Sequence, residues 1–408
     1  MGRVREFSEK LWNGDEQFSG DKNPLWLFAG LEALDDDLAF LSSFSNVTAI
    51  RTGEGLVLID TGGHLFAGAT FDAIRRWTQD RVHTAIYTHG HVDHAFGLGP
   101  FERADGPARV IAHEAVPARF DRYQLTAGYN EVINARQFRT PGIRWPTEYR
   151  YPDVTYRDTL TVDVGGVTLE LHHDRGETDD HTWVWLPQRK AICTGDLFIW
   201  ASPNCGNPQK VQRYPREWAA ALRAMQALGA ETLFPGHGPP IFGPDRVDRA
   251  LGDTARLLET LVDQTLALMN EGARLDDILH AVRVPDDLLS RPYLRPVYDE
   301  PAFVVRNLWR LYGGWYDGNP AHLKPPRDAD LAAELAALAG GAAALAARAE
   351  ALAAEGRLDL AASLAEFAAL AAPDDAGVRD VRRAVYRARA ERETSLMARS
   401  IFRAAADE

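Results

Sequence analysis

The chain has 408 residues, of which 46% are hydrophobic and 25% are charged, and its formal net charge is −13. This length predicts two or three globular domains, and the acidic balance argues against nucleic acid as the main partner. With two cysteines we expect no disulfide framework and a reducing compartment. The N-terminal residues lack the apolar core of a signal peptide, and no run of about 18 apolar residues occurs. We therefore expect no membrane span and a cytoplasmic location.

The first third of the chain predicts alternating strands and helices. Phe71, Ile74 and Trp77 recur at helical spacing and predict a helix over residues 68–81. Apolar runs bounded by turn residues predict strands at residues 41–50, 55–59, 82–87 and 109–112.

Residues 88–94 follow one of these strands and read Thr-His-Gly-His-Val-Asp-His. A strand that ends in a tight loop can direct several side chains to one point. His89, His91 and His94 offer imidazole nitrogens and Asp93 offers a carboxylate, which are ligands that suit zinc and its first-row neighbours. Four potential ligands in six residues favour a metal site over a polar loop that happens to be rich in histidine.

Residues 115–157 interrupt this pattern with seven arginines and five tyrosines. Pro141, Pro146 and Pro152 are expected to break regular structure. Such a long connection either covers a functional site or forms a solvated surface loop, and the sequence favours neither.

The middle of the chain predicts a second group of strands. Gly165-Gly166 between two apolar runs is a strong hairpin signal. An amphipathic helix over residues 215–228 begins at Pro215 and is followed by Gly229. The strands are expected at residues 160–164, 167–172, 182–186, 190–195 and 231–234.

Three later positions offer further metal ligands. Asp196 follows a predicted strand, and its two oxygens allow it to bridge two cations, although it could instead cap the next turn. His237 also follows a predicted strand and is flanked by glycines. The third position lies in residues 174–181, where the residues alone do not choose between Glu177 and His181.

The chain changes character near residue 247, after which no strand is predicted. Ala and Leu dominate from Asp328, and Gly340-Gly341, Gly356 and residues 373–375 divide that region into three or four helices. These predict stacked helical hairpins of the tetratricopeptide type or a simple bundle, in either case a packing or association module. We therefore predict an α/β domain over residues 1–246 and an α-helical domain over residues 247–408. The earlier helices of the second domain are expected at residues 245–271, 275–282 and 300–315.

The order of these motifs resembles that of the metallo-β-lactamase-fold hydrolases. The resemblance covers residues 40–245 and implies an αββα sandwich with a two-metal site at one edge. The matching segments are His89-x-His91-x-Asp93-His94, Thr194-Gly195-Asp196, Gly236-His237-Gly238 and the early turn Asp60-Thr61-Gly62.

The resemblance also selects Glu177 for the third position. In many members a Gly-His segment precedes the Thr-Gly-Asp aspartate at the spacing that Gly176-Glu177 has here, with Glu177 19 residues before Asp196. A glutamate at this place is a feature of the alkyl sulfatase branch. In residues 247–400, the segments 307–320, 338–341 and 371–374 resemble the alkyl sulfatase dimerisation domain. This resemblance implies a homodimer. Asp196 departs from the glutamate usual in that branch, and since the chain ends at Glu408 we expect no sterol-carrier-type domain.

The resemblance implies a complete ligand set for two divalent metal ions, with Zn²⁺ expected first and Mn²⁺ or Fe²⁺ as alternatives. Such a pair makes hydroxide available for hydrolysis near neutral pH. The negative charge of Glu177 should weaken the metals as Lewis acids and favour harder cations such as Mn²⁺. Catalytic roles are assigned to Asp93, Asp196 and His181, although for His181 the orientation of a metal ligand is favoured over contact with the leaving group. The ligands are His89, His91 and Glu177 for one metal, Asp93, His94 and His237 for the other, and Asp196 as the bridge.

The leading hypothesis is a dimetal hydrolase of alkyl sulfatase type that cleaves a sulfate ester or a related small anionic ester with a metal-bound hydroxide. Lys210 and Arg213 are the first candidates for binding the substrate anion, with Asn204 and Asn207 in support. Tyr129 and Asn134, in the segment of residues 115–157, are the second candidates. Hydrolysis of a thioester, lactone or phosphoester is the alternative, because the fold alone does not determine the reaction. A non-catalytic helical-repeat scaffold with a structural metal is a third hypothesis.

Overall fold

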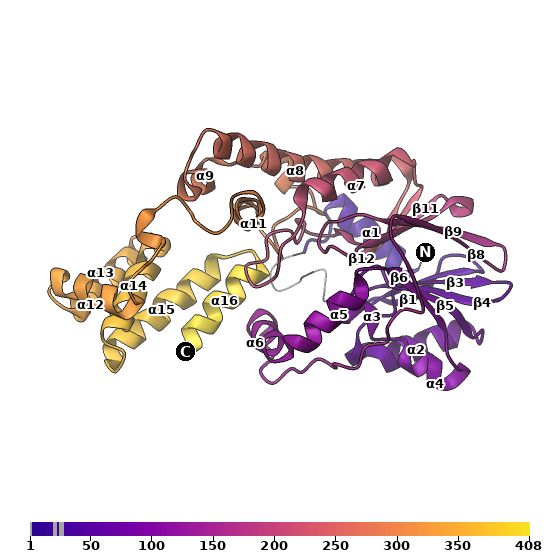
Figure 1. The fold of residues 1–408 in the computed structure, drawn as a ribbon, viewed down its shortest axis with the longest axis horizontal. Helices are drawn as coiled ribbons and strands as arrows, with labels where there is room; N and C mark the ends of the chain where they lie inside the picture. The colour runs from indigo at the N-terminus through magenta and orange to yellow at the C-terminus, as the bar shows by residue number, and fades with distance from the viewer. Residues whose placement is uncertain (1, 19–22, 24–27) are drawn as a thin grey trace. The chain divides into compact units, whose positions relative to one another are not determined.

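The computed structural model describes residues 2–18, 23 and 28–408, and the chain divides into two compact units. The predicted boundary between residues 246 and 247 stays a prediction. Figure 1 shows the strands and helices that make up each unit. The first unit comprises Met1–Asn130, Arg144–Ala273 and Asp277–Gly314, and the second comprises Glu131–Ile143, Arg274–Asp276 and Trp315–Glu408.

The first unit contains two sheets, with strand orders β1-β2-β3-β4-β5-β6-β7 and β13-β12-β11-β10-β9-β8. The strands of the first sheet are β1 (Gly30–Ala33), β2 (Leu38–Ser42), β3 (Val47–Thr52), β4 (Gly55–Ile59), β5 (Val82–Ile86), β6 (Arg109–His113) and β7 (Val154–Tyr156). The strands of the second sheet are β8 (Thr159–Val164), β9 (Val167–His173), β10 (Thr182–Leu186), β11 (Ala191–Ile199), β12 (Thr232–His237) and β13 (Ile241–Phe242).

Eleven α-helices occur up to residue 313 in the described part of the chain. They are α1 (Arg3–Asn13), α2 (Ala67–Trp77), α3 (Val92–Ala95), α4 (Gly99–Asp105), α5 (Val116–Leu125), α6 (Ala127–Phe138), α7 (Pro215–Ala227), α8 (Pro244–Asn270), α9 (Leu275–Ala281), α10 (Asp286–Leu289) and α11 (Pro301–Gly313). The short helix α3 carries Asp93 and His94 of the histidine motif.

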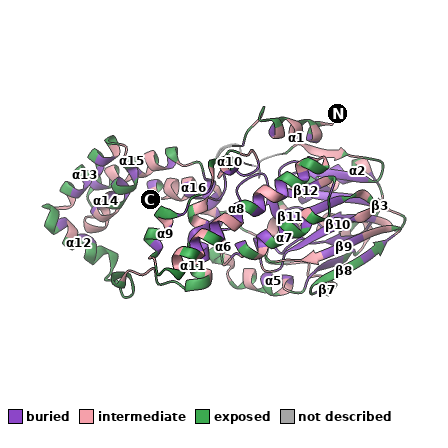
Figure 2. Ribbon diagram, turned by 90° about the horizontal axis from the view of Figure 1, so that it is seen from above, coloured by how far each residue is buried: buried purple, intermediate pink, exposed green. Residues whose placement is uncertain are grey.

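The two sheets pack face to face around an apolar core. Ile50, Val57 and Ile86 of the first sheet share one buried cluster with Leu171 and Val184 of the second. The other face of the first sheet packs against α2, α4 and α5, while α7 and α8 contact β11 and β12 of the second sheet. Figure 2 shows the strands of both sheets as mostly buried. This order of layers confirms the predicted αββα sandwich.

One predicted strand is wrong in its extent. Residues 41–50 form the end of β2, a turn, and most of β3, because the mostly polar residues at 43–46 turn the chain between two antiparallel strands. The turn side chain of Asn46 donates hydrogen bonds to the carbonyls of Pro235 and Gly238 at 2.9 and 2.8 Å. The turn thereby fixes the backbone on both sides of His237.

The segment of residues 115–157 is more helical than expected. α5 and α6 occupy its first half, and irregular backbone is confined to residues 139–153, where Pro141, Pro146 and Pro152 lie. Pro117 is compatible with α5 because it lies in the first turn, where a helix needs no backbone donor.

The second unit is helical, in agreement with the all-α C-terminal part of the predicted fold class. Residues from 328 onward form five helices rather than three or four, because the chain also breaks at residues 393–395, which contain neither glycine nor proline. There the Ser395 hydroxyl accepts the Ala398 N–H at 3.3 Å and caps the last helix. The helices are α12 (Asp328–Ala339), α13 (Ala342–Ala354), α14 (Leu358–Ala371), α15 (Ala376–Arg392) and α16 (Leu396–Asp407).

Small apolar side chains hold these helices together. Ala349, Ala361 and Ala365 are buried with Leu352 and Val385 in one cluster, so helix backbones approach closely. Within the described residues, no single helix is long and apolar enough to cross a bilayer. The bent pair α12 and α13, whose axes meet at 84°, meets these two criteria only when both helices are taken together.

Candidate metal centre

The structure brings together the seven predicted ligands, all of which belong to the first unit. They come from the C-terminal ends of strands or from the segments that follow strands, as the motif positions predicted. His89 and His91 lie between β5 and α3, Asp93 and His94 on α3, Glu177 between β9 and β10, Asp196 on β11, and His237 at the end of β12.

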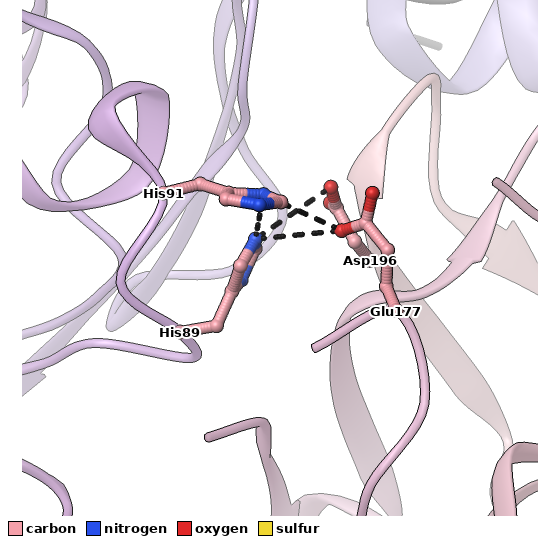
Figure 3. Close-up of side chains that lie close together, drawn as sticks. All are labelled: His89, His91, Glu177 and Asp196. Carbon is pink, nitrogen blue, oxygen red and sulfur yellow. Dashed lines mark hydrogen bonds and ion pairs between the residues drawn. The ribbon is translucent and has the colours of Figure 1, made fainter. Parts of the chain in front are cut away.

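The first group consists of His89, His91, Glu177 and Asp196, whose donor atoms lie within 4.8 Å of one another. Glu177 Oε2 is 3.6 Å from His89 Nε2 and 3.4 Å from His91 Nδ1. Asp196 Oδ2 is 3.8 Å from His89 Nε2. Figure 3 shows the two imidazoles facing the two carboxylates across a small central space. This arrangement can hold one cation.

The second group consists of Asp93, His94 and His237, and Asp196 adjoins it as well. Asp93 Oδ2 is 3.5 Å from both His94 Nε2 and His237 Nε2. Asp196 Oδ1 lies 3.3 Å from His94 Nε2, and Asp196 Oδ2 lies 3.4 Å from His237 Nε2. A Cβ on Gly236 would overlap Asp196 Oδ1, so glycine at residue 236 leaves room for the carboxylate between the two groups.

Buried polar atoms without partners show that these residues fit a metal. His94 Nε2, Glu177 Oε2 and Asp196 Oδ1 are buried, and none has a hydrogen-bond partner among the described residues. Buried polar atoms are normally paired, because an unpaired one loses its hydration without compensation. Cations in this space would satisfy all three, and imidazole and carboxylate donors suit Zn²⁺, Mn²⁺ or Fe²⁺.

The outer nitrogens of the histidines are held by a network that starts at Asp60, directly after β4. Asp60 Oδ2 is 2.7 Å from His94 Nδ1 and accepts the Thr88 hydroxyl at 2.8 Å. Thr88 Oγ1 is also 3.0 Å from His89 Nδ1, and His237 Nδ1 is 2.5 Å from the Phe44 carbonyl. Each of the three imidazoles therefore presents Nε2 to the centre.

A second network holds the loop between His89 and His91. Asp180 Oδ2 accepts the Gly90 N–H at 2.9 Å and pairs with Arg119 Nε at 2.8 Å. Burial raises the pKa of Asp180, but Arg119 and the Gly90 N–H outweigh it and keep the pKa below its ordinary value. The sequence alone assigns no role to Asp60 or Asp180, because their neighbours in the chain are the same as those of an ordinary aspartate in a turn.

His181, predicted as a catalytic residue, lies outside the two ligand groups. Its ring stacks on that of His89, with centroids 4.7 Å apart and planes at 22°. His181 Nε2 is 3.1 Å from the Thr194 carbonyl, and burial lowers the pKa of the ring to about 4. The ring is therefore neutral at pH 7 and can act as a rigid support for His89.

Two of the predicted substrate-binding residues, Arg213 and Asn204, contact Glu177. Arg213 Nη1 pairs with Glu177 Oε1 and donates to the Glu177 carbonyl at 3.0 Å. The Asn204 amide also donates to Glu177 Oε1. All three side chains are buried.

The other predicted substrate-binding residues are less closely tied to the ligands. Lys210 is half-buried, and burial and the charge of Arg213 lower its pKa to about 8. Asn207 is buried and accepts the Gln209 N–H at 3.0 Å. Tyr129 is exposed, and Asn134 belongs to the part of α6 in the second unit.

Tyr298 and Asp299, just before α11, are residues near the centre that the sequence did not single out. Burial raises the pKa of Tyr298 well above its ordinary value, and the carboxylates of Glu177 and Asp93 act in the same direction. Asp299 Oδ2 accepts the Gly206 N–H at 2.6 Å, and burial raises its pKa to about 6. Residues 298 and 299 fell in the region predicted to be an association module, which carried no signal of a site.

Family models and the fold define the class of the chain. A metallo-beta-lactamase superfamily model matches residues 42–237, and an alkyl sulfatase dimerisation model matches residues 274–408. The chain thus consists of a metallo-beta-lactamase superfamily domain followed by an alkyl sulfatase dimerisation domain, which confirms the resemblance seen in the sequence.

The chain is also similar to several sulfatases. The chain is 26% identical over 83% of its length to a linear primary-alkylsulfatase from a Pseudomonas species, covering 69% of that protein. It is 29% identical over 73% of its length to an (R)-specific secondary-alkylsulfatase from a Pseudomonas species, covering 50% of it. An alkyl/aryl-sulfatase of Saccharomyces cerevisiae is 26% identical over 83% of the chain and is covered to 57%. The chain therefore spans between half and about two thirds of the length of these relatives.

A solved structure shares the fold. The stereoselective inverting sec-alkylsulfatase Pisa1 from a Pseudomonas species superposes with a TM-score of 0.86 over 98% of this chain and 69% of its own, at 23% identity. At this identity the likeness concerns the fold.

Proposed function

We propose that the chain is a metal-dependent hydrolase that cleaves sulfate esters or closely related small anionic esters. The observation that carries this proposal is the pair of ligand groups that meet at Asp196, one of which contains Glu177 where a histidine is common. The alkylsulfatase activity of the similar proteins supports it.

The metals would be two divalent cations. Zn²⁺ is the first candidate, and Mn²⁺ and Fe²⁺ are the alternatives. His89, His91 and Glu177 would hold one, Asp93, His94 and His237 the other, and Asp196 would bridge them. When bound, the pair would supply a Lewis acid and activated water for hydrolysis.

The residues around the ligands have separate tasks in this proposal. Asp60, Thr88 and the Phe44 carbonyl orient the imidazoles, and buried, neutral His181 supports the ring of His89. Lys210 is the best candidate for binding the substrate anion, since it is positively charged at pH 7, is partly accessible, and feels the charges of Glu177 and Asp93.

We further propose that the chain forms a homodimer through its alkyl sulfatase dimerisation domain. Sedimentation of the purified protein at several concentrations measures this directly, and a monomer at all concentrations would contradict it. The cytoplasmic location also stays a proposal, for which fractionation of cells is the measurement.

A substrate panel tests the reaction. Primary and secondary alkyl sulfates, an aryl sulfate, a phosphoester, a lactone and a thioester are offered to the metal-loaded protein, and sulfate release is expected. Turnover of another ester without any sulfate release would overturn the sulfatase proposal. One tightly held metal and no turnover of any ester would instead support the structural-metal scaffold.

A further inference from the structure

The two oxygens of the Glu177 carboxylate face different partners. Oε2 faces the histidines of the first ligand group, His89 at 3.6 Å and His91 at 3.4 Å. Oε1 contacts Arg213 and accepts a hydrogen bond from Asn204. The side chains of Glu177 and Arg213 are only 1% and 4% exposed. The carboxylate is therefore held on one side so that a single oxygen remains for a cation.

The buried pair of Glu177 and Arg213 has no net charge. Glu177 adds one negative charge to the first ligand group, and the contacting guanidinium of Arg213 adds one positive charge. The sum is zero, which is the charge of the neutral histidine common at this place. Because charges interact strongly in a poorly solvated site, an uncompensated guanidinium at this distance would repel a cation.

Arg213 is also fixed at its backbone. The Asn307 amide of α11 donates to the Arg213 carbonyl at 3.0 Å, and Asn307 Oδ1 accepts the Arg213 N–H at 3.4 Å. Gln212 Nε2 donates to the same Oδ1 at 2.9 Å. The guanidinium meanwhile donates to the backbone carbonyl of Glu177 at 3.0 Å. Both the backbone and the guanidinium of Arg213 are therefore held by hydrogen bonds. This rigidity is expected of a residue that positions a metal ligand rather than of one that must adapt to a substrate.

We propose that Arg213 is a positioning residue of the metal centre, which neutralises Glu177 and presents one of its oxygens to the metal, and that Asn307 of α11 holds Arg213 in place. This revises our expectation that Arg213 binds the substrate anion. It rests on the metal centre of the proposed function but not on the identity of the substrate. It also gives α11, which lies in the part of the chain matched by the dimerisation model, a role in shaping the ligands.

A charge-swap series tests the proposal through metal affinity, measured by competition with a chromophoric chelator for Zn²⁺ and by metals bound per chain. Glu177→His should lower the affinity by about tenfold or more, because Arg213 then faces the cation without its counter-charge. Adding Arg213→Met to Glu177→His should restore most of that loss. The matched control adds Arg157→Met instead, since Arg157 pairs with Glu114 at the surface, and it should restore nothing.

A second measurement covers the case in which the double variant does not fold. In Arg213→Met the bound metal is the counter-charge that remains for Glu177, whereas in Arg213→Lys the lysine supplies a positive charge even without metal. The rise in unfolding temperature on adding Zn²⁺ should therefore be larger in Arg213→Met than in Arg213→Lys.

The outcomes separate this inference from the proposed function. If the double variant binds Zn²⁺ no better than Glu177→His, or if Arg213→Met and Arg213→Lys respond equally to Zn²⁺, the inference is overturned. If Arg213→Met alters only the KM for the substrate, Arg213 binds the anion after all. If the unchanged protein binds no metal, the proposed function fails first.

Discussion

His94 Nδ1 lies 2.7 Å from Asp60 Oδ2, on the side of the ring opposite to Nε2, which lies 3.3 Å from Asp196. Asp60 adopts a left-handed backbone conformation with φ 57° directly after β4. This unusual conformation places its carboxylate under the histidine motif, where Thr88 also contacts it. The Asp60 side chain therefore orients His94 directly and His89 through Thr88, which are histidines of both ligand groups.

Asp60→Asn should lower the affinity for Zn²⁺ by about 10–100-fold, which is the usual effect of removing an outer partner of a metal ligand. Asparagine keeps the size and tolerates a positive φ, so backbone strain does not confuse the result. Chelator competition measures the affinity. Asp80→Asn is the control, because Asp80 pairs with Arg51 near the surface, and equal affinities of the two variants would contradict the role of Asp60.

Removal of the metals should abolish ester hydrolysis and lower the unfolding temperature, since the buried carboxylates and imidazoles then face one another without a cation. Adding Zn²⁺ or Mn²⁺ back should restore both. Asp196→Ala should not recover activity on metal addition, because Asp196 adjoins both ligand groups. The exposed Asp163→Ala is the control and should recover fully; activity that survives a strong chelator would refute metal dependence.

Lys210 should make substrate binding depend on pH. Burial and the neighbouring Arg213 lower its pKa to about 8, so Lys210 loses its positive charge as the pH rises through that value. The KM for a sulfate ester should therefore rise between pH 7 and 9. Lys210→Arg keeps its charge over this range and should keep a low KM. Lys210→Met should have a high KM throughout, and an unchanged KM in that variant would exclude Lys210 from anion binding.

Gly206→Ala should destabilise the protein by about 2–4 kcal/mol, because a Cβ there would overlap the backbone of Phe303 and Val304 at the start of α11. The segment that carries Asn204 and Arg213 would have to move, so Zn²⁺ affinity should fall as well. Gly68→Ala on α2 is the control, because a Cβ there meets nothing within 4 Å. That substitution should stabilise the protein by up to about 1 kcal/mol. Urea unfolding measures both, and equal stabilities would contradict the close packing.

The local sequence was sufficient to predict most of the metal ligands and most of the strands that precede them. His89, His91, Asp93 and His94 are close in the chain, so a loop after a strand places them together whatever the rest of the fold does. Hydrophobic runs and glycine turns likewise located most strands. The resemblance selected Glu177, and the structure places His181 against His89 outside the two ligand groups.

Only the tertiary structure decided which side chains support those ligands. Asp60 and His94 are 34 residues apart, Gly90 and Asp180 are 90 apart, and the Asn307 side chain reaches residue 213 across 94 positions. The sequence predicts that Arg213 binds the substrate anion, and its contact with Glu177, 36 residues away, is seen only in the structure. The physical reason is that a hydrogen bond or ion pair between distant elements depends on strand order and on the packing of helices on the sheets, and neither leaves a local pattern.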